Sequence, residues 1–244
     1  EIVKKEFIKK YGSIREMNGK LRLDRKTFIN KSNNSITIGH IKKSGIYDTI
    51  KNNISHFKTQ KGIKVKINSL NKNMLYLMGL IASDGNNTKE KNTKRYTRIK
   101  FHNKNKELIE IFEKKYKQLF PEFNLSKKIR KDGLIELDSS NSFFATICAN
   151  FGIKSPQKHS DIKKILMLNK ELIASFLKGY FDGDGSPYKK SKIKNKGNYS
   201  KIEYFTINNI DAKRIHQMLL KLGISNKIFK KNNGINVISI NNIV

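Results

Sequence analysis

The chain of 244 residues repeats the stretch Leu77-Met78-Gly79-Leu80-Ile81-Ala82-Ser83-Asp84-Gly85 one hundred residues later as Leu177-Lys178-Gly179-Tyr180-Phe181-Asp182-Gly183-Asp184-Gly185. Each copy is an apolar, helix-forming run that contains a glycine and closes with Asp-Gly. An internal repeat at a fixed spacing predicts two copies of one structural unit. It also places two carboxylates, Asp84 and Asp184, at equivalent positions.

The residues around each copy predict a helix that carries the repeated stretch. In the first copy we expect a helix from Leu70 to Ser83, with Asn68-Ser69 as capping residues. In the second copy Asn169 can cap a helix that runs to Gly183. Each helix is followed by a polar, lysine-rich stretch, residues 86–94 and 186–198, and then by an alternating strand, residues 95–102 and 201–207.

The rest of each copy continues the same order of elements. Amphipathic helices are expected at 108–119 and 212–222, and further strands at 127–137 and 227–240. The first copy adds a helix at 142–150, whereas the second has no counterpart before Val244. We therefore expect an α+β fold of two pseudo-symmetric αββαββα repeats, packed through their repeated helices, each with an antiparallel sheet.

This pattern divides the chain into three regions. Residues 1–68 form a basic N-terminal extension, 69–167 the first repeat, and 168–244 a second repeat that is short at its C-terminus. The extension is either an accessory DNA-binding region or the remains of an intein splicing domain. No splice-junction cysteine begins the chain, so the second alternative has no direct support.

The charge is strongly positive along the whole chain. Lys and Arg number 51 against 20 Asp and Glu, which gives a net charge of +31. Such a field attracts a polyanion, although an A·T-rich genome would also raise the lysine content. In the first strand Arg98 and Lys100 share a face opposite Ile99 and Phe101. We expect cationic strand faces to bind DNA, with Arg98, Lys100, Lys128, Arg130, Lys201 and Lys230 as examples.

Composition also limits the compartment. The single cysteine, Cys148, excludes an intrachain disulfide and suits a reducing compartment, such as the cytosol or an organellar matrix, and not secretion. No apolar run approaches the roughly 20 residues that span a bilayer, so no membrane partner is expected. The sequence has no glycine-rich phosphate loop, which argues against nucleotide hydrolysis.

Small residues recur at helical spacing inside the repeated stretch. Gly79 and Ser83 are four residues apart, as are Gly179 and Gly183, so each pair lies on one helix face. Glycine inside a soluble helix costs about 1 kcal/mol relative to alanine, and close helix–helix packing would offset that cost. If the two helices pack on each other, Asp84 and Asp184 emerge side by side.

Two neighbouring carboxylates repel each other, and a divalent cation removes that penalty. Oxygen ligands with retained water favour Mg²⁺. A single Asp-Gly after an apolar helix is usually only a helix stop. Two copies in so basic a chain instead favour a metal site formed by Asp84 and Asp184.

These stretches resemble the motif of the LAGLIDADG homing endonucleases, in the single-chain form with two motifs. The second copy is the closer match, while the first has Ala82 and Ser83 where the motif has Asp and Ala. The resemblance implies a monomeric, Mg²⁺- or Mn²⁺-dependent endonuclease, encoded in an intron or intein. It would cut both strands of a long, asymmetric double-stranded DNA site and leave short 3′ overhangs.

The resemblance also implies a lysine between the motifs that helps to activate water. Lys158 is the first candidate and Lys154 the second, and the matching lysine of the second repeat would lie beyond Val244. The alternative function is binding without cleavage, by a DNA-binding regulator or an RNA-binding maturase of the same fold. Retention of Asp84 and Asp184 favours the nuclease.

Overall fold

The computed structural model describes residues 2–21, 38–54, 56–58, 63–66, 69–90, 95–155, 161–184, 186–190, 199–206 and 208–241. The chain forms two compact units, Glu1–Ile67 and Asn68–Val244. In the described part, no helix combines the length and apolar character needed to cross a membrane.

The second unit contains the two predicted repeats. The first repeat consists of α6 (Lys72–Asp84), β3 (Gly85–Lys89), β4 (Tyr96–Asn103), α7 (Lys106–Leu119), β5 (Ser126–Ile129), β6 (Ile135–Ser139) and α8 (Ser142–Asn150). After the 3₁₀ helix η3 (Ile162–Met167), the second consists of α9 (Lys170–Asp184), β7 (Ser186–Lys190), β8 (Tyr199–Thr206), α10 (Asn209–Lys221), β9 (Lys227–Lys230) and β10 (Asn236–Asn241).

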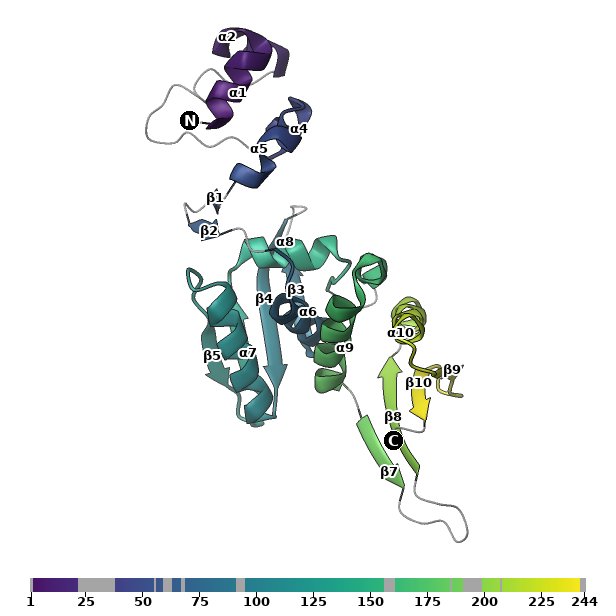
Figure 1. The fold of residues 1–244 in the computed structure, drawn as a ribbon. Helices are drawn as coiled ribbons and strands as arrows, with labels where there is room; N and C mark the ends of the chain where they lie inside the picture. The colour runs from purple at the N-terminus through teal and green to yellow at the C-terminus, as the bar shows by residue number, and fades with distance from the viewer. Residues whose placement is uncertain are drawn as a thin grey trace. The chain divides into compact units, whose positions relative to one another are not determined.

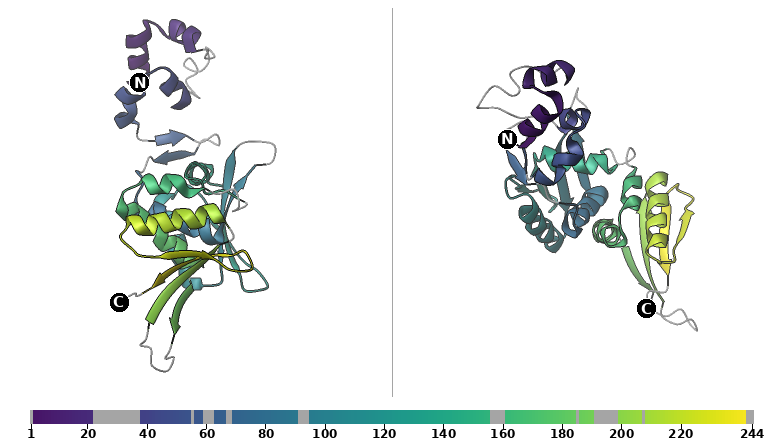
Figure 2. Two further views of the ribbon diagram at one scale, coloured as in Figure 1. Left: turned by 90° about the vertical axis from the view of Figure 1, so that its right-hand side faces the viewer. Right: turned by 45° about the horizontal axis from the view of Figure 1, so that its top comes forward.

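The two sheets have the same topology. Their strand orders are β3-β4-β6-β5 and β7-β8-β10-β9, and every neighbouring pair is antiparallel. Figure 1 shows α6 and α9 side by side, and Figure 2 shows α10 along one face of the second sheet. The predicted α+β fold with antiparallel sheets is therefore confirmed.

The helix starts follow local capping rules, with one difference from the sequence prediction. The side chain of Asn169 accepts a hydrogen bond from the Leu172 N–H at 2.9 Å, as predicted. In the first repeat the cap is Asn71, which accepts from the Met74 N–H at 3.0 Å, and not Asn68-Ser69. Asn71 is as good a cap as its neighbours, so the sequence offered three candidates within four residues.

Each sheet has one face against helices and one open face. In the first sheet the buried side chains of Ile99, Phe101, Ile135 and Leu137 lie on the helix-covered face. The intervening residues Arg98, Lys100, Glu136 and Asp138 lie on the other face, which we call the first open face. Strand alternation in residues 95–102 therefore predicted this part of the fold correctly.

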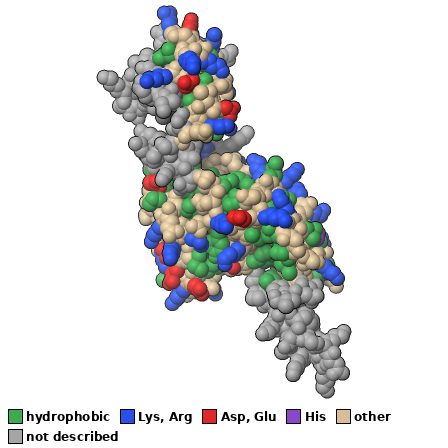
Figure 3. Space-filling view, viewed as in Figure 1, with side chains coloured by type: hydrophobic (Ala, Val, Ile, Leu, Met, Phe, Trp, Pro, Cys, Tyr) green, Lys and Arg blue, Asp and Glu red, His purple; other side chains and the backbone are tan. Residues whose placement is uncertain are grey.

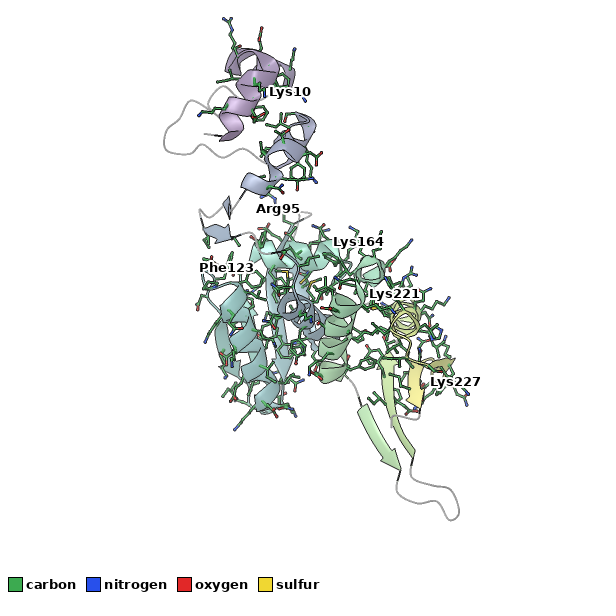
Figure 4. The ribbon with its side chains drawn as sticks, viewed as in Figure 1. Lys10, Arg95, Phe123, Lys164, Lys221 and Lys227 are labelled. Atoms are coloured by element: carbon green, nitrogen blue, oxygen red, sulfur yellow. The ribbon has the colours of Figure 1, made fainter. Side chains whose placement is uncertain are left out.

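The second sheet follows the same rule. Tyr204 pairs with Ile238, and both are buried on the helix-covered side. The opposite face, called the second open face, carries Glu203, Phe205, Lys227, Phe229, Val237 and Ser239 by pairing register. At the far end of α10, Lys221 Nζ donates to the carbonyl oxygens of Leu166 at 2.6 Å and Leu168 at 3.0 Å (Figure 4), which ties α10 to the segment before α9.

The first unit is small and mainly helical. It contains α1 (Ile2–Tyr11), α2 (Ile14–Leu21), α4 (Ile38–Lys43), α5 (Tyr47–Ile50), the 3₁₀ helix η1 (Lys51–Asn53) and an antiparallel pair, β1 (His56–Lys58) and β2 (Lys64–Lys66). Its core is formed by Phe7, Ile41, Ile46 and Ile50. Among its glycines, Gly45 has a positive φ of 69° and joins α4 to α5.

The two repeated helices pack with their backbones in contact. A Cβ atom added at Gly79 would collide with the carbonyl oxygen of Phe176, and one added at Gly179 would collide with the carbonyl oxygen of Tyr76. One turn further on, a Cβ at Gly183 would collide with the Ser83 hydroxyl. The helices can approach this closely because glycine has only a hydrogen atom where every other residue has a β-carbon.

We expect Gly79→Ala to destabilise the second unit by roughly 2–4 kcal/mol, because the methyl group meets backbone that cannot move independently. Gly19→Ala is the control, since nothing lies within 4 Å of a Cβ there and alanine favours the helix. Calorimetric unfolding should show opposite signs for the two variants. A stabilising Gly79→Ala would contradict the close contact.

Candidate active site

Asp84 and Asp184 are the last residues of α6 and α9, so the helix pair brings both carboxylates to the same end. The two side chains are hydrogen-bonded to each other. Burial, the negative charge of Asp84 and this hydrogen bond raise the pKa of Asp184 to about 7. Asp184 therefore keeps its proton up to near neutral pH, as expected for a carboxyl group held against another carboxylate.

Asn103, which the sequence did not single out, fixes the first carboxylate. It is the last residue of β4, and its Nδ2 donates to Asp84 Oδ2 at 2.6 Å. An amide donor can hold a carboxylate without neutralising it. The signal available in the sequence was only its position at the end of a strand that follows the repeated helix, which is too weak to identify it.

The second carboxylate, Asp184, lies near two buried tyrosines. Tyr180 and Tyr204 are both fully buried, and the Tyr204 hydroxyl donates to the Tyr180 hydroxyl at 2.6 Å. Burial and nearby carboxylates, Asp184 among them, raise the pKa of both phenols. The first repeat has Leu80 and Phe101 at the equivalent positions, so the two carboxylates have different surroundings.

A polar contact across the helix pair adds to this asymmetry. Tyr76 of α6 donates its hydroxyl proton to Asp182 Oδ2 of α9 at 2.7 Å. Lys178 lies one turn from Asp182 and reaches the same oxygen at 3.5 Å. The equivalent residues of the other copy are Phe176 and Ala82, which cannot form such a contact.

The predicted lysine, Lys158, lies outside the described residues. The ends of its segment are joined, because the Asp161 N–H donates to the Gly152 carbonyl oxygen at 3.0 Å. A Cβ at Gly152 would collide with the backbone of Asp161, so the closure requires glycine. The second candidate, Lys154, is exposed.

The first open face is less cationic than the sequence predicted. Arg98 forms two contacts with Asp138, both at 2.6 Å, and Lys100 lies 2.8 Å from Glu136 and 3.6 Å from Asp138. The carboxylates come from the neighbouring strand β6, which sequence periodicity alone does not align with β4. They hold Arg98 and Lys100 in defined positions and reduce the charge of this face.

The other predicted DNA-binding residues are dispersed. Lys128 is exposed on the first open face, opposite Glu136. Arg130 follows β5 in a turn, where its guanidinium lies 3.4 Å from Asp132. Lys201 lies in β8 and its side chain is outside the described ones, whereas Lys230 pairs with Asn236 on the helix-covered side of the second sheet. The DNA-binding role of these residues stays a prediction.

The donor set of the carboxylate pair fits a hard divalent cation. Its ligands are oxygens, and the raised pKa of Asp184 reflects first its burial and then the negative charge of Asp84, both of which a cation would offset. Within the described ranges, no group of three or more His, Cys, Asp or Glu side chains is positioned to hold a metal ion. Asp84 and Asp184 would therefore need further oxygens from substrate or water to complete a coordination sphere.

Comparison with known proteins identifies the fold. Residues 171–243 match the model of the LAGLIDADG-like domain. A crystal structure of I-DmoI in complex with DNA and Mn has a TM-score of 0.51 and 19% identity, covering 70% of this chain and 90% of that one. An I-DmoI variant, solved with its target DNA nicked in the coding strand, has a TM-score of 0.50 and 21% identity, covering 69% and 88%. I-DmoI is a homing endonuclease, so the predicted resemblance is confirmed for the fold.

A curated relative shares part of the sequence. An A-type ATP synthase subunit of Methanopyrus kandleri is 29% identical over 126 residues, which cover 52% of this chain and 11% of the relative. The matched region thus spans about a tenth of that protein's length.

The carboxylate pair predicts an unusual pH dependence of stability. A folded-state pKa of about 7 for Asp184 lies above the ordinary value of about 4. Between these values the folded form holds a proton that the unfolded form has released, so stability falls as pH rises. Asp184→Asn should therefore stabilise the metal-free protein above pH 7, by only about 1 kcal/mol because the side chain keeps contact with solvent.

This gain should close as pH falls to about 4, where the Asp184 carboxyl is protonated in the folded form and begins to be protonated in the unfolded form as well. Calorimetry in EDTA at several pH values measures it. Glu110→Gln, the same chemical change on the exposed face of α7, should show no such trend. An unchanged or lower midpoint for Asp184→Asn at pH 8 would contradict the predicted repulsion.

Proposed function

We propose that this chain, which has the LAGLIDADG fold, is a site-specific endonuclease that cuts both strands of duplex DNA and leaves short 3′ overhangs. The observation that carries the proposal is the contact between Asp84 and Asp184 at one end of the helix pair. The open face of a sheet extends on each side of the pair (Figure 1), as a long DNA site requires.

Each part of the site has a proposed role. Asp84 and Asp184 would hold Mg²⁺ or Mn²⁺, which supplies an activated water and stabilises charge on the phosphate when bound. Asn103 orients the Asp84 carboxylate. Lys158 is the candidate for a lysine that assists proton movement near the cut. Figure 3 shows Lys and Arg side chains spread over the surface, where they would contact phosphates.

Two further aspects belong to the same proposal. A single chain with unequal repeats would act as a monomer on an asymmetric target. The match to 11% of an ATP synthase subunit favours an intein origin over an intron or free-standing one, because an endonuclease inserted in a host protein would give such a match.

The test uses a plasmid pool with randomised inserts, from which cleaved molecules are recovered as linear DNA. We expect the full chain to linearise a defined subset with Mg²⁺ or Mn²⁺ and none in EDTA. The double variant Asp84→Asn, Asp184→Asn should bind the recovered sequence and not cut it. Glu110→Gln should cut as wild type.

Two results would overturn this assignment. Undiminished cleavage by the double variant would remove the carboxylates from the site. Tight binding of selected DNA by the wild type, without cleavage in either metal, would establish the binding-only alternative.

Asn103→Ala should lower the cleavage rate by about 10- to 100-fold, the usual effect of removing a hydrogen bond that orients a metal ligand. The Mg²⁺ concentration for half-maximal rate should rise, while DNA affinity in EDTA stays the same. Asn73→Ala is the control, because Asn73 contacts Lys115 at the opposite end of α6. An unchanged metal requirement in Asn103→Ala would show that Asn103 does not position Asp84.

A further inference from the structure

The two open faces differ in chemistry at equivalent positions. In the first, His102 pairs with Glu136, which pairs with Lys128. In the second, Phe205 pairs with Val237, which pairs with Phe229. We call these sets the polar row and the apolar row.

The hairpin turns establish that the two rows are equivalent. The Arg130 N–H donates to the Leu134 carbonyl at 2.8 Å, and the Lys231 N–H donates to the Ile235 carbonyl at the same distance. In the first sheet Lys128 lies two residues before the turn donor Arg130, and in the second Phe229 lies two residues before the turn donor Lys231. The two rows therefore begin at equivalent positions. A charged and hydrogen-bonding set in one repeat has become a hydrophobic set in the other.

The side chains of the apolar row differ in their exposure to solvent. Val237 in the central strand is 0% exposed, whereas Phe229 on the edge strand is 45% exposed. The Lys231 ammonium lies 4.6 Å from the centre of the Phe205 ring. Tyr204 and Ile238 lie on the other, helix-covered side, so the exposed Phe229 is not part of the protein core.

The rows lie next to the carboxylate ends of the repeats. His102 precedes Asn103, which holds Asp84, and Phe205 precedes Thr206 at the equivalent end of β8. DNA that lies over the site would therefore meet these rows with the base pairs nearest the cut.

We propose that Phe229, the exposed member of the apolar row, binds the 5-methyl groups of thymines in the major groove of one half-site, with the half-buried Phe205 and the buried Val237 beside it in the row. Hydrocarbon side chains cannot hydrogen-bond to base edges, and the thymine methyl is the apolar group that the major groove offers. The flanking cations Lys227 and Lys231 (Lys227 in Figure 4) suit neighbouring phosphates and favour DNA over an uncharged protein partner. The inference rests on the proposed function and adds which half-site is thymine-rich.

The polar row would recognise DNA through hydrogen bonds instead. His102, Glu136 and Lys128 offer hydrogen-bond donors and acceptors, and Arg98 and Lys100 are held next to them by carboxylates. The first repeat therefore discriminates by hydrogen bonds and the second by methyl contacts. This difference makes the target asymmetric in composition as well as in sequence.

The test removes single methyl groups from the DNA. In the sequence recovered from the plasmid pool, each thymine is replaced in turn by deoxyuridine, and binding by the full chain is measured in EDTA. We expect affinity to fall about three- to fivefold for each contacted methyl, the effect of exposing one buried methyl group. The loss should be confined to a short block in one half-site, next to the cut.

Phe229→Ser should abolish this uracil effect and keep binding to the other half-site. Ile129→Ser is the matched control, because Ile129 is 67% exposed on the equivalent edge strand of the first sheet but on its helix-covered side. It should keep the wild-type pattern.

The outcomes separate this inference from the proposed function. Equal binding of thymine and uracil targets, or a uracil effect that persists in Phe229→Ser, would overturn the thymine assignment while cleavage stands. A chain that recovers no DNA from the pool would overturn both.

Discussion

The structure depends on direct backbone contact between α6 and α9. Gly79 meets the Phe176 carbonyl and Gly179 meets the Tyr76 carbonyl, so any side chain at either position would push the helices apart. That separation would also part Asp84 from Asp184, and it would change the spacing of the two sheets that follow the helices. One steric requirement therefore sets both the proposed chemistry and the span of DNA that the open faces would cover.

The sequence was sufficient for the elements whose periodicity is strong. The repeated stretch, the alternation of residues 95–102 and the stripe of α7 predicted helices and strands close to those observed. Contacts between distant residues were not predictable in this way. Glu136 and Asp138 neutralise Arg98 and Lys100 because β6 pairs with β4 in one register, and Lys230 lies on the helix-covered side of its sheet because of the register between β9 and β10. A single residue of register decides which face a side chain occupies.

In the candidate site, too, the residues of the repeated stretch were predictable and the contacts between distant residues were not. Two copies of Asp-Gly at one spacing predicted the carboxylate pair, since any symmetric packing of the helices brings them together. Asn103 was not predictable, because its role depends on where β4 ends relative to α6. The hydrogen bond between Tyr180 and Tyr204 near Asp184 was not predictable either, since both residues have the sequence pattern of ordinary core residues.

The hydrogen bond from Tyr76 to Asp182 affects which repeats can pair with each other. If two first repeats paired, each Tyr76 would face Ala82 and its hydroxyl would lose its acceptor. If two second repeats paired, each Asp182 would face Phe176 and would keep only Lys178 of its own helix as a donor. A buried hydroxyl without an acceptor costs about 1–3 kcal/mol, and a pairing of two first repeats incurs this cost twice because Tyr76 is buried. The contact therefore favours the pairing of a first repeat with a second repeat over the pairing of two first repeats.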